Sequence, residues 1–396
     1  MSSPSITLYS LPEIARSYPK PVFTMLPNHL RSVKLDSSAR GLEYHSRFLE
    51  ADVINTYKGR YAIYHALEAA GRIRKGDSIL MPAYHCPSMI EPALMRHLKP
   101  VFYPLDDKLN PDLSAIVERT SNSVIAILVT HFFGRVFDFS KVVEWAHGRD
   151  ILVIEDCAHA FGHTIGQVVP GIQGDMAIAS SAKFFPGGHG GRLVLNIESD
   201  QPALKSAGLL KEVKDVKSLL EPVQSNSLKI VDASNVKDKI DRIDLDKDLQ
   251  PHQIKCQSNS LHWCNREDAK IKNTRVMNFV IRLIDKRALV ARRRHIYERL
   301  SKIIDARPDM SLLYGDYQPD IPYVVPVILR NPQKQFSWLK YARIPLWRWE
   351  EVAISDCKFT AQHKNSLIQL PCHQNMTDSQ LDWLIKSIQI MPINGG

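Results

Sequence analysis

The stretch that decides the fold comprises residues 153–159, VIEDCAH, residues 176–183, MAIASSAK, and the glycine cluster GGHGG at residues 187–191. One apolar run ends in an acid, and a second ends in hydroxyls and one lysine. Short apolar runs with such flanks predict buried strands. Open α/β sheets bind their ligands at the carboxyl ends of the strands, so Asp156 and Lys183 are predicted to face one ligand site.

Strands and helices alternate on either side of this stretch. Strands are predicted at residues 78–81, 101–103, 124–130, 151–154, 176–180 and 192–196, and helices at 60–70, 87–96 and 139–147. A further helix opens at residues 110–112, with Asn110 as its cap and Pro111 in its first turn. This alternation predicts an α/β fold with a mostly parallel sheet, and continuous apolar strands predict helices on both faces.

The chain divides by composition into four parts. Residues 1–55 are irregular and are expected to form an N-terminal arm, and residues 56–224 form the large domain. Residues 225–272 are rich in polar side chains, and we interpret them as an insertion, partly disordered, although the Lys-Asp alternation at 236–242 equally suits a short surface helix. Residues 273–396 contain linking helices at 276–304 and a smaller α+β domain that ends in a helix at 378–389.

Composition narrows the classes of function. The 396 residues are 44% hydrophobic and carry a formal net charge of +9, which we interpret as a basic surface, because no nucleic-acid-binding signature accompanies it. The run of arginines at 292–294 is interpreted as a solvated helix face. No apolar stretch is long enough to cross a membrane and no secretory signal is evident. The six cysteines form no Cys-x-x-Cys pair and predict reduced thiols in a cytoplasmic protein.

A resident metal is not predicted. His159 and His163 are four residues apart and His131 is not far away, but no carboxylate or thiolate completes a zinc pattern in the sequence.

A lysine and an acid at adjacent strand ends are the equipment that pyridoxal 5'-phosphate (PLP) requires. The lysine can form a Schiff base and the acid can hold the pyridinium nitrogen. Gly59 and Arg60 begin the first regular helix, whose N–H groups form a natural phosphate site. Each signal alone is weak. Asp156 could equally be a helix cap or a turn residue, and Lys183 and Arg60 could be solvent-exposed cations. The glycines at 187–191 do not have the spacing of a nucleotide-binding loop.

Together, residues 59–194 and 273–396 resemble the DegT/DnrJ/StrS sugar aminotransferases, which are fold-type-I PLP-dependent enzymes. The motif Glu-Asp-x-Ala-His/Gln appears as residues 155–159, and Lys-x4-Gly-Glu-Gly-Gly appears as Lys183 with residues 188–191. The Asn-Tyr-Arg segment resembles residues 273–275. The proline-to-aromatic turn over the cofactor resembles residues 82–86, and the strand that ends in Val-His resembles residues 129–131.

The resemblance implies the roles of the site residues. Lys183 would hold the cofactor and move the proton, Asp156 would bind the pyridinium nitrogen, and His159 would lie beside the ring. Ser180 and the Gly59-Arg60 turn would bind the phosphate. Cys86 would occupy the position of the aromatic stacking residue. Asn273 would reach the phosphate of a partner subunit, which implies a homodimer with shared active sites.

The chain departs from the family pattern at several positions. Lys58-Gly59-Arg60 replaces Ser-Gly-Thr, His189 replaces the glutamate of the glycine cluster, and Cys86 replaces an aromatic residue. The approach from Asp175 to Lys183 is two residues shorter than usual.

The predicted function is transfer of an amino group from an amino acid, glutamate or glutamine, to a keto sugar, in its usual form linked to a nucleotide, within sugar or polysaccharide biosynthesis. The alternatives are a PLP-fold lyase or dehydratase and a non-catalytic PLP-fold binding or scaffold protein. Lys183 argues against the dehydratase branch, whose members carry histidine there. The altered phosphate turn and His189 are the support for a non-catalytic protein.

Overall fold

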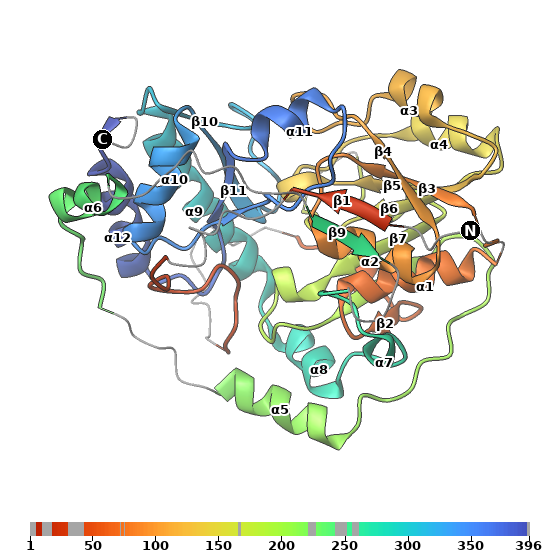
Figure 1. Cartoon of the computed structure of the whole chain (residues 1–396). Coiled ribbons are helices and arrows are strands. Elements are labelled where there is room, and N and C mark those ends of the chain that lie inside the picture. The colour runs from red at the N-terminus through yellow and green to blue at the C-terminus, as the bar shows by residue number, and fades with distance from the viewer. Residues whose placement is uncertain are drawn as a thin grey trace.

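A computed structural model gives the fold of this chain and describes residues 5–9, 18–30, 43–71, 73–74, 76–164, 168–220, 227–241, 252–255 and 261–393. Figure 1 shows a large sheet with helices α1 to α4 around it, and a second group of strands and helices that contains the C-terminus. Within the described ranges, no helix combines the length and the apolar character that crossing a membrane requires.

The large sheet has seven strands in the order β2-β8-β7-β6-β5-β3-β4. Their bounds are β2 Ile54–Thr56, β3 Ser78–Pro82, β4 Lys99–Tyr103, β5 Val124–Thr130, β6 Leu152–Asp156, β7 Met176–Ser180 and β8 Gly191–Leu195. The five strands from β7 to β4 are parallel, whereas β8 and β2 join antiparallel at one edge. The predicted mostly parallel sheet is confirmed, and the parallel strands place the ends of β6 and β7 at one edge.

Helices cover both faces of this sheet. Successive residues of β6 pack on opposite faces of the sheet. Ile154 packs with helices α1 Gly59–Ala69 and α2 Pro87–Met95. Val153 packs with helices α3 Leu113–Arg119 and α4 Ser140–His147. This is the alternation that a strand imposes on its side chains. Since both faces are buried, the strands read as continuous apolar runs.

The second sheet is small and antiparallel, with strand order β10-β11-β13-β12. Its strands are β10 Met310–Leu312, β11 Val324–Leu329, β12 Trp347–Arg348 and β13 Leu367–Pro371, and its helices include α10 Pro332–Tyr341, α11 Lys358–His363 and α12 Asp378–Gln389. The predicted cap of the last helix is present, because Thr377 and Gln380 form a capping box. The linking helices are α8 Arg275–Leu283 and α9 Lys286–Asp305.

The polar segment 225–272 contains described structure. Helix α6 Ala233–Ile240 is the short helix that the Lys-Asp alternation allowed, and Val236 and Ile240 are buried on it. Strand β9 His252–Lys255 pairs antiparallel with β1 Ser5–Leu8 of the N-terminal arm, and α7 Arg266–Ala269 follows. We retain the predicted domain boundaries at residues 55, 224 and 272 as proposals.

One local prediction is wrong, and one helix was not predicted. The helix at residues 113–119 is capped by Asp112, whose carboxylate accepts the N–H groups of Ser114 and Ala115, and not by Asn110. A carboxylate one residue before the helix reaches those two donors, whereas Asn110 lies too early in the chain. Helix α5 Leu209–Leu220 was not predicted at all, and it lies at the periphery beside α8 (Figure 1).

The arginine run on α9 is also not a solvated face. Arg293 is 0% exposed, and Arg292 and Arg294 are partly buried. Neighbouring residues on a helix point about 100° apart, so the three guanidinium groups have different hydrogen-bond partners. Arg292 donates to Met376 and Asp378, Arg293 to the carbonyl of Lys183, and Arg294 to Asp320 and Thr164. The sequence could not reveal this, because the segments that they contact lie far away along the chain.

Candidate active site

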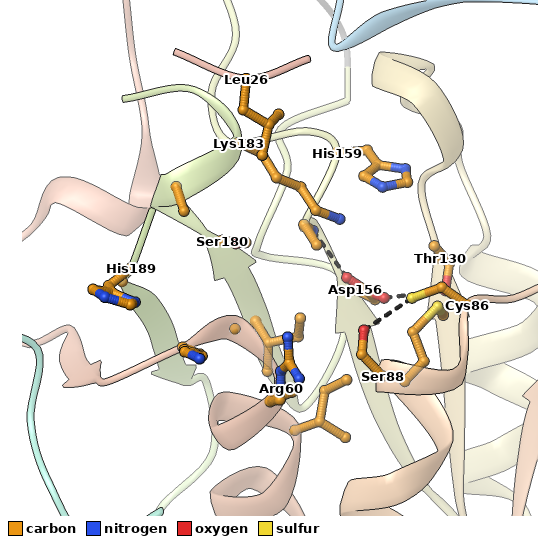
Figure 2. A pocket seen from close by; sticks show the side chains of 18 of the residues that line it. Leu26, Arg60, Cys86, Ser88, Thr130, Asp156, His159, Ser180, Lys183 and His189 are labelled. Atoms are coloured by element: carbon orange, nitrogen blue, oxygen red, sulfur yellow. Dashed lines mark hydrogen bonds between the residues drawn. The ribbon is translucent and has the colours of Figure 1, made fainter. Parts of the chain in front are cut away.

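The carboxyl ends of β6 and β7 open into a pocket of about 190 Å³. It is lined by seven of the eight predicted site residues: Gly59, Arg60, Cys86, Asp156, His159, Ser180 and Lys183. Figure 2 shows the side chains of Lys183, Asp156 and His159 pointing into the same space, with Arg60 and His189 on the opposite side. The topology therefore brings together residues that are up to 124 positions apart, from Gly59 to Lys183.

Lys183 ends a short 3-10 helix, Ser181–Lys183, that directly follows β7. Burial lowers the pKa of its amine below the ordinary value, and the neighbouring Cys86 and Asp156 oppose that shift. The ammonium nitrogen lies 5.2 Å from the centre of the Tyr323 ring. A lysine amine with a lowered pKa is more often neutral, which is the form that attacks a carbonyl carbon.

Asp156 is the last residue of β6 and is 2% exposed. Its carboxylate accepts the N–H of Ala158 at 2.9 Å and the hydroxyl of Thr130 at 3.4 Å. Burial raises its pKa, while the charge of Lys183 opposes the rise. A buried carboxylate of this kind is stabilised by a cation that enters the pocket beside it.

His159 is held as a neutral ring. Its Nδ1 accepts the N–H of Phe133 at 3.1 Å, so in the neutral tautomer the proton is on Nε2. The ring stacks on Tyr323 at a centroid distance of 4.3 Å and an angle of 16°, and burial lowers its pKa well below the ordinary value. Phe133 has a φ of 55°, a strained conformation that aims its N–H at the histidine.

The other end of the pocket is suited to an anion. Helix α1 begins at Gly59 with no side-chain cap; the Tyr61 N–H donates to the Lys58 carbonyl at 3.0 Å, whereas the N–H groups of Gly59 and Arg60 have no hydrogen-bond partner among the described residues and can bind a ligand. A Cβ on Gly59 would lie 3.0 Å from the Cβ of Ser180, so glycine is needed for the helix to approach the end of β7. Lys58 and Arg60 add two positive charges beside this helix start.

His189 is a lining residue that the motif comparison treated only as a departure. Its ring stacks on Tyr57 at 4.7 Å, and its Nε2 lies 3.7 Å from a carboxylate oxygen of Asp215 on α5. Burial lowers its pKa, and Asp215 opposes that shift. Sequence reasoning missed the Tyr57 and Asp215 contacts, because neither residue lies in a recognised motif.

Several residues that line the pocket or pack beside it carried no sequence signal. Leu26 comes from the N-terminal arm, and Ser88 lies in α2, where its hydroxyl oxygen is 2.9 Å from the sulfur of Cys86. Tyr323 comes from the segment before β11 and contacts both Lys183 and His159. Apolar and hydroxyl side chains of this kind are common throughout the chain, so only their position identifies them.

Asn273 does not line this pocket of its own chain. It is 4% exposed, and a Cβ on Gly190 would lie 3.1 Å from its Nδ2. Its Nδ2 donates to Asn278, and its Oδ1 is buried without a hydrogen-bond partner among the described residues. The role that the resemblance gives it, in a partner's site, stays a prediction.

The histidines named as metal candidates do not share a site with each other. Instead, ligand atoms of His131, Glu155 and Cys157 lie within 4.8 Å of one another in the core. The Glu155 carboxylate already accepts hydrogen bonds from His131 and Cys157 and from the N–H groups of residues 171, 173 and 174. Because these donors occupy both carboxylate oxygens, the cluster is a structural hydrogen-bond network.

Comparison with known proteins shows which proteins this chain resembles in sequence and in fold. Residues 43–218 match the model of the DegT/DnrJ/EryC1/StrS aminotransferase family, so the resemblance predicted from the motifs is confirmed over this segment. The chain has the fold of the PLP-dependent aminotransferases of fold type I.

Individual relatives agree with this class. The chain is similar to the GDP-perosamine synthase of Escherichia coli O157:H7, with 31% identity over 141 residues, which cover 35% of this chain and 38% of that protein. Among solved structures it is similar to Helicobacter pylori PseC, an aminotransferase of pseudoaminic acid biosynthesis (TM-score 0.61, 13% identity, 93% and 98% of the two chains). It also resembles NtdA of Bacillus subtilis with bound PMP (TM-score 0.55, 14% identity, 85% and 72% of the two chains).

The similarity in sequence is concentrated in the large domain. The chain matches well under half the length of its curated relatives. The match covers 38% of the GDP-perosamine synthase and 26% of the lipopolysaccharide biosynthesis protein RfbH of Salmonella typhimurium. The solved structures are similar along most of the chain, but at less than 20% identity. The fold is therefore shared along most of the chain, whereas the sequence match to the family model is limited to residues 43–218, which include most of the residues that line the pocket.

Proposed function

We propose that this protein is a PLP-dependent aminotransferase that moves an amino group from an amino acid, glutamate or glutamine, to a keto sugar. The observation that carries the proposal is one pocket in which Lys183 and Asp156 face each other across from the free N-terminus of α1. The family match over residues 43–218 supports the same activity.

The residues present fit the cofactor. The close approach of Gly59 to Ser180 brings the start of α1 to the end of β7, where it would form a cradle for the phosphate. The charge of Lys183 opposes the effect of burial on the Asp156 carboxylate, and His131 does so to a smaller extent, so a further cation beside Asp156 would be stabilising. Bound PLP supplies an aldehyde carbon for amines and a ring that withdraws electrons from the carbon next to the amine. That NtdA was solved with PMP adds support from a protein of the same fold.

Each side chain then has a chemical task. Lys183 would hold the cofactor through its Nζ, and its lowered pKa favours the neutral amine, which can attack a carbonyl carbon and accept a proton. Asp156 would bind a protonated ring nitrogen through its buried carboxylate. The Nε2–H of His159 is available as a donor toward the pocket, because Nδ1 is engaged by Phe133. Ser180, Arg60 and the α1 N-terminus bind the phosphate.

We propose a nucleotide-linked keto sugar as the usual acceptor, within sugar or polysaccharide biosynthesis, and a cytoplasmic location. The similarity to a GDP-perosamine synthase supports the acceptor class. The five cysteines among the described residues are all free thiols, which agrees with a reducing compartment.

We also propose a homodimer with shared active sites. Helices α5 and α8 expose apolar side chains that this chain does not cover: Leu209, Leu210, Val213 and Leu220 on α5, and Phe279 and Leu283 on α8. The same helix reaches the pocket, because α5 also carries the buried Asp215 beside His189. A second copy docked there would border the pocket and bury this surface, and sedimentation equilibrium measures whether it does.

A visible absorbance spectrum tests the proposed activity. Protein reconstituted with PLP should show a visible absorbance band from the adduct with Lys183, and glutamate or glutamine should shift the band to shorter wavelength. Borohydride treatment and peptide mapping should place the adduct at Lys183, and the Lys183→Ala variant should yield none. An adduct at another lysine would contradict the assignment, and binding without a spectral shift for any amino acid would favour the non-catalytic alternative.

A further inference from the structure

Arg293 on α9 is a buried cation without a counter-charge. It is 0% exposed, and its guanidinium forms no ion pair with any acid in the described part of the chain. Burial lowers its pKa to about 10, so it remains protonated at neutral pH. Burying an arginine among neutral groups is costly, because its hydration is lost without an opposite charge in return. A neutral side chain would fill the same space at lower cost.

The first set of acceptors belongs to the segment that carries Lys183. The Nη2 of Arg293 donates to the carbonyl of Lys183 at 3.0 Å, and the guanidinium lies 4.7 Å from the centre of the Phe184 ring. The Nε donates to the amide oxygen of Gln374 at 3.0 Å. Gln374 in turn donates to the carbonyl of Phe184 at 2.7 Å. Two consecutive carbonyls of the lysine segment are therefore held by one pair of side chains.

The second set of acceptors belongs to the small domain. The Nη1 of Arg293 donates to the carbonyls of Pro322 and Tyr323 at 2.9 and 3.3 Å. The Tyr323 ring is the surface over which the Lys183 amine lies and on which His159 stacks. One planar group with five donors thus fixes the backbone beneath the lysine and the backbone behind its aromatic neighbour.

We propose that Arg293 is a positioning residue for the Lys183 amine. It fastens the 3-10 helix of residues 181–183 to the start of β11, and so sets where the amine lies relative to Tyr323 and His159. Arg293 acts through backbone carbonyls and does not touch a substrate or the cofactor. This inference deepens the proposed function, since it names a residue that the Lys183 chemistry would depend on.

Hydrogen exchange in the cofactor-free protein tests the proposal without relying on activity. The variant Arg293→Met keeps the length of the side chain but removes all five donors. The amides of residues 181–186 and 322–325, apart from Pro186 and Pro322, which have no amide hydrogen, should exchange at least about tenfold faster in this variant, because their segments open locally without the fork. In the PLP-loaded protein, kcat should fall by about tenfold or more while KM changes little, because alignment of the amine is lost rather than binding.

The matched control is Arg292→Met. Arg292 lies next on the same helix and donates to the Met376 carbonyl and to Asp378, away from the lysine segment. It should leave the exchange of residues 181–186 and kcat within about twofold of the parent. Equal acceleration of exchange in both variants would show a general loss of stability and would overturn the proposal.

Two milder variants keep the test decisive if Arg293→Met does not fold. Arg293→Lys retains the charge but at most part of the fork, and Gln374→Met removes the bond to Phe184. Each should accelerate exchange at residues 181–186 by a smaller factor, and unchanged exchange in both would refute the positioning role. If the parent protein forms no adduct at Lys183, the proposed function fails, whereas the exchange experiment still decides what Arg293 holds.

Discussion

Replacing Asp156 by asparagine removes one charge from the pocket and almost nothing else. The side chain is 2% exposed, and asparagine can still accept the Ala158 N–H through its Oδ1 and place its amide beside the Thr130 hydroxyl. The local fold should therefore survive, so the substitution isolates the carboxylate charge.

The magnitude follows from the burial. Losing one partner of a buried charged pair costs about 3–5 kcal/mol. If the ring nitrogen of the cofactor is the other partner during the reaction, kcat should fall roughly 150- to 5,000-fold, because each 1.36 kcal/mol is a factor of ten. The cofactor should remain bound, since the phosphate end and Lys183 are unchanged.

The assay is single-turnover transamination followed by absorbance, and the cofactor-free protein provides a second readout. Since the Asp156 carboxylate raises the pKa of the Lys183 amine, its removal should lower that pKa further and shift the pH midpoint of amine labelling downward. A variant that retains kcat within about threefold of the parent would refute a pyridinium contact.

Asp175→Asn is the matched control for Asp156→Asn. Asp175 is also buried, at 8% exposed, but it lies before β7 at the opposite end of the sheet and accepts the Val153 N–H at 2.8 Å and a His147 hydrogen bond at 2.9 Å. Its replacement should lower stability and leave kcat and the labelling midpoint of Lys183 unchanged. Loss of activity in both variants would point to damage to the sheet.

Two further predictions concern the phosphate end and pH. Gly59→Ala places a Cβ 3.0 Å from the Cβ of Ser180, so equilibrium dialysis should show a PLP Kd higher by about tenfold, or about 1.4 kcal/mol. The control is Gly148→Ala, whose Cβ meets only ordinary contacts and which should bind PLP with the affinity of the parent. Equal affinities in the two variants would contradict a phosphate cradle at Gly59. Burial lowers the pKa of His85 to about 4, and both its ring nitrogens serve backbone partners. The unfolded chain then binds more protons below pH 6.5, so stability should fall as pH drops from 6.5 to 4, by about 3 kcal/mol for His85 alone. Urea unfolding should show a shallower pH slope in His85→Gln, and an equal slope would remove His85 as the cause.

The large domain was predictable because its signals are local. Residues 124–130 and 176–180 were predicted as strands with the bounds that the structure gives, since runs of six and four apolar residues that end in Thr130 and Ser180 allow little else. The C-terminal helix was predictable because Thr377 and Gln380 form a capping box within four residues. Helix α5 was missed, although its residues have a helical period, because its apolar side is not buried in the chain's own core.

The candidate site divides in the same way. Asp156, Lys183 and Gly59 were predictable, because a strand end or a helix start fixes where their side chains point. Tyr323, Leu26 and Arg293 were not, because their roles come from packing between segments more than 100 residues apart in the sequence. Arg293 differs from Arg292 only in which side of α9 it occupies.

The sequence by itself determined a parallel sheet with an acid and a lysine at neighbouring strand ends, because apolar periodicity and chain order are enough to specify that edge. Only the tertiary structure decided what surrounds the Lys183 amine. It places the stacked rings of His159 and Tyr323 beside the amine, and the N-terminus of α1 against Ser180. It also places the buried Arg293 guanidinium between the carbonyls of Lys183 and Pro322. The physical reason is that hydrogen bonds and ring contacts between distant segments depend on how the elements pack, and no local pattern of residues records that packing.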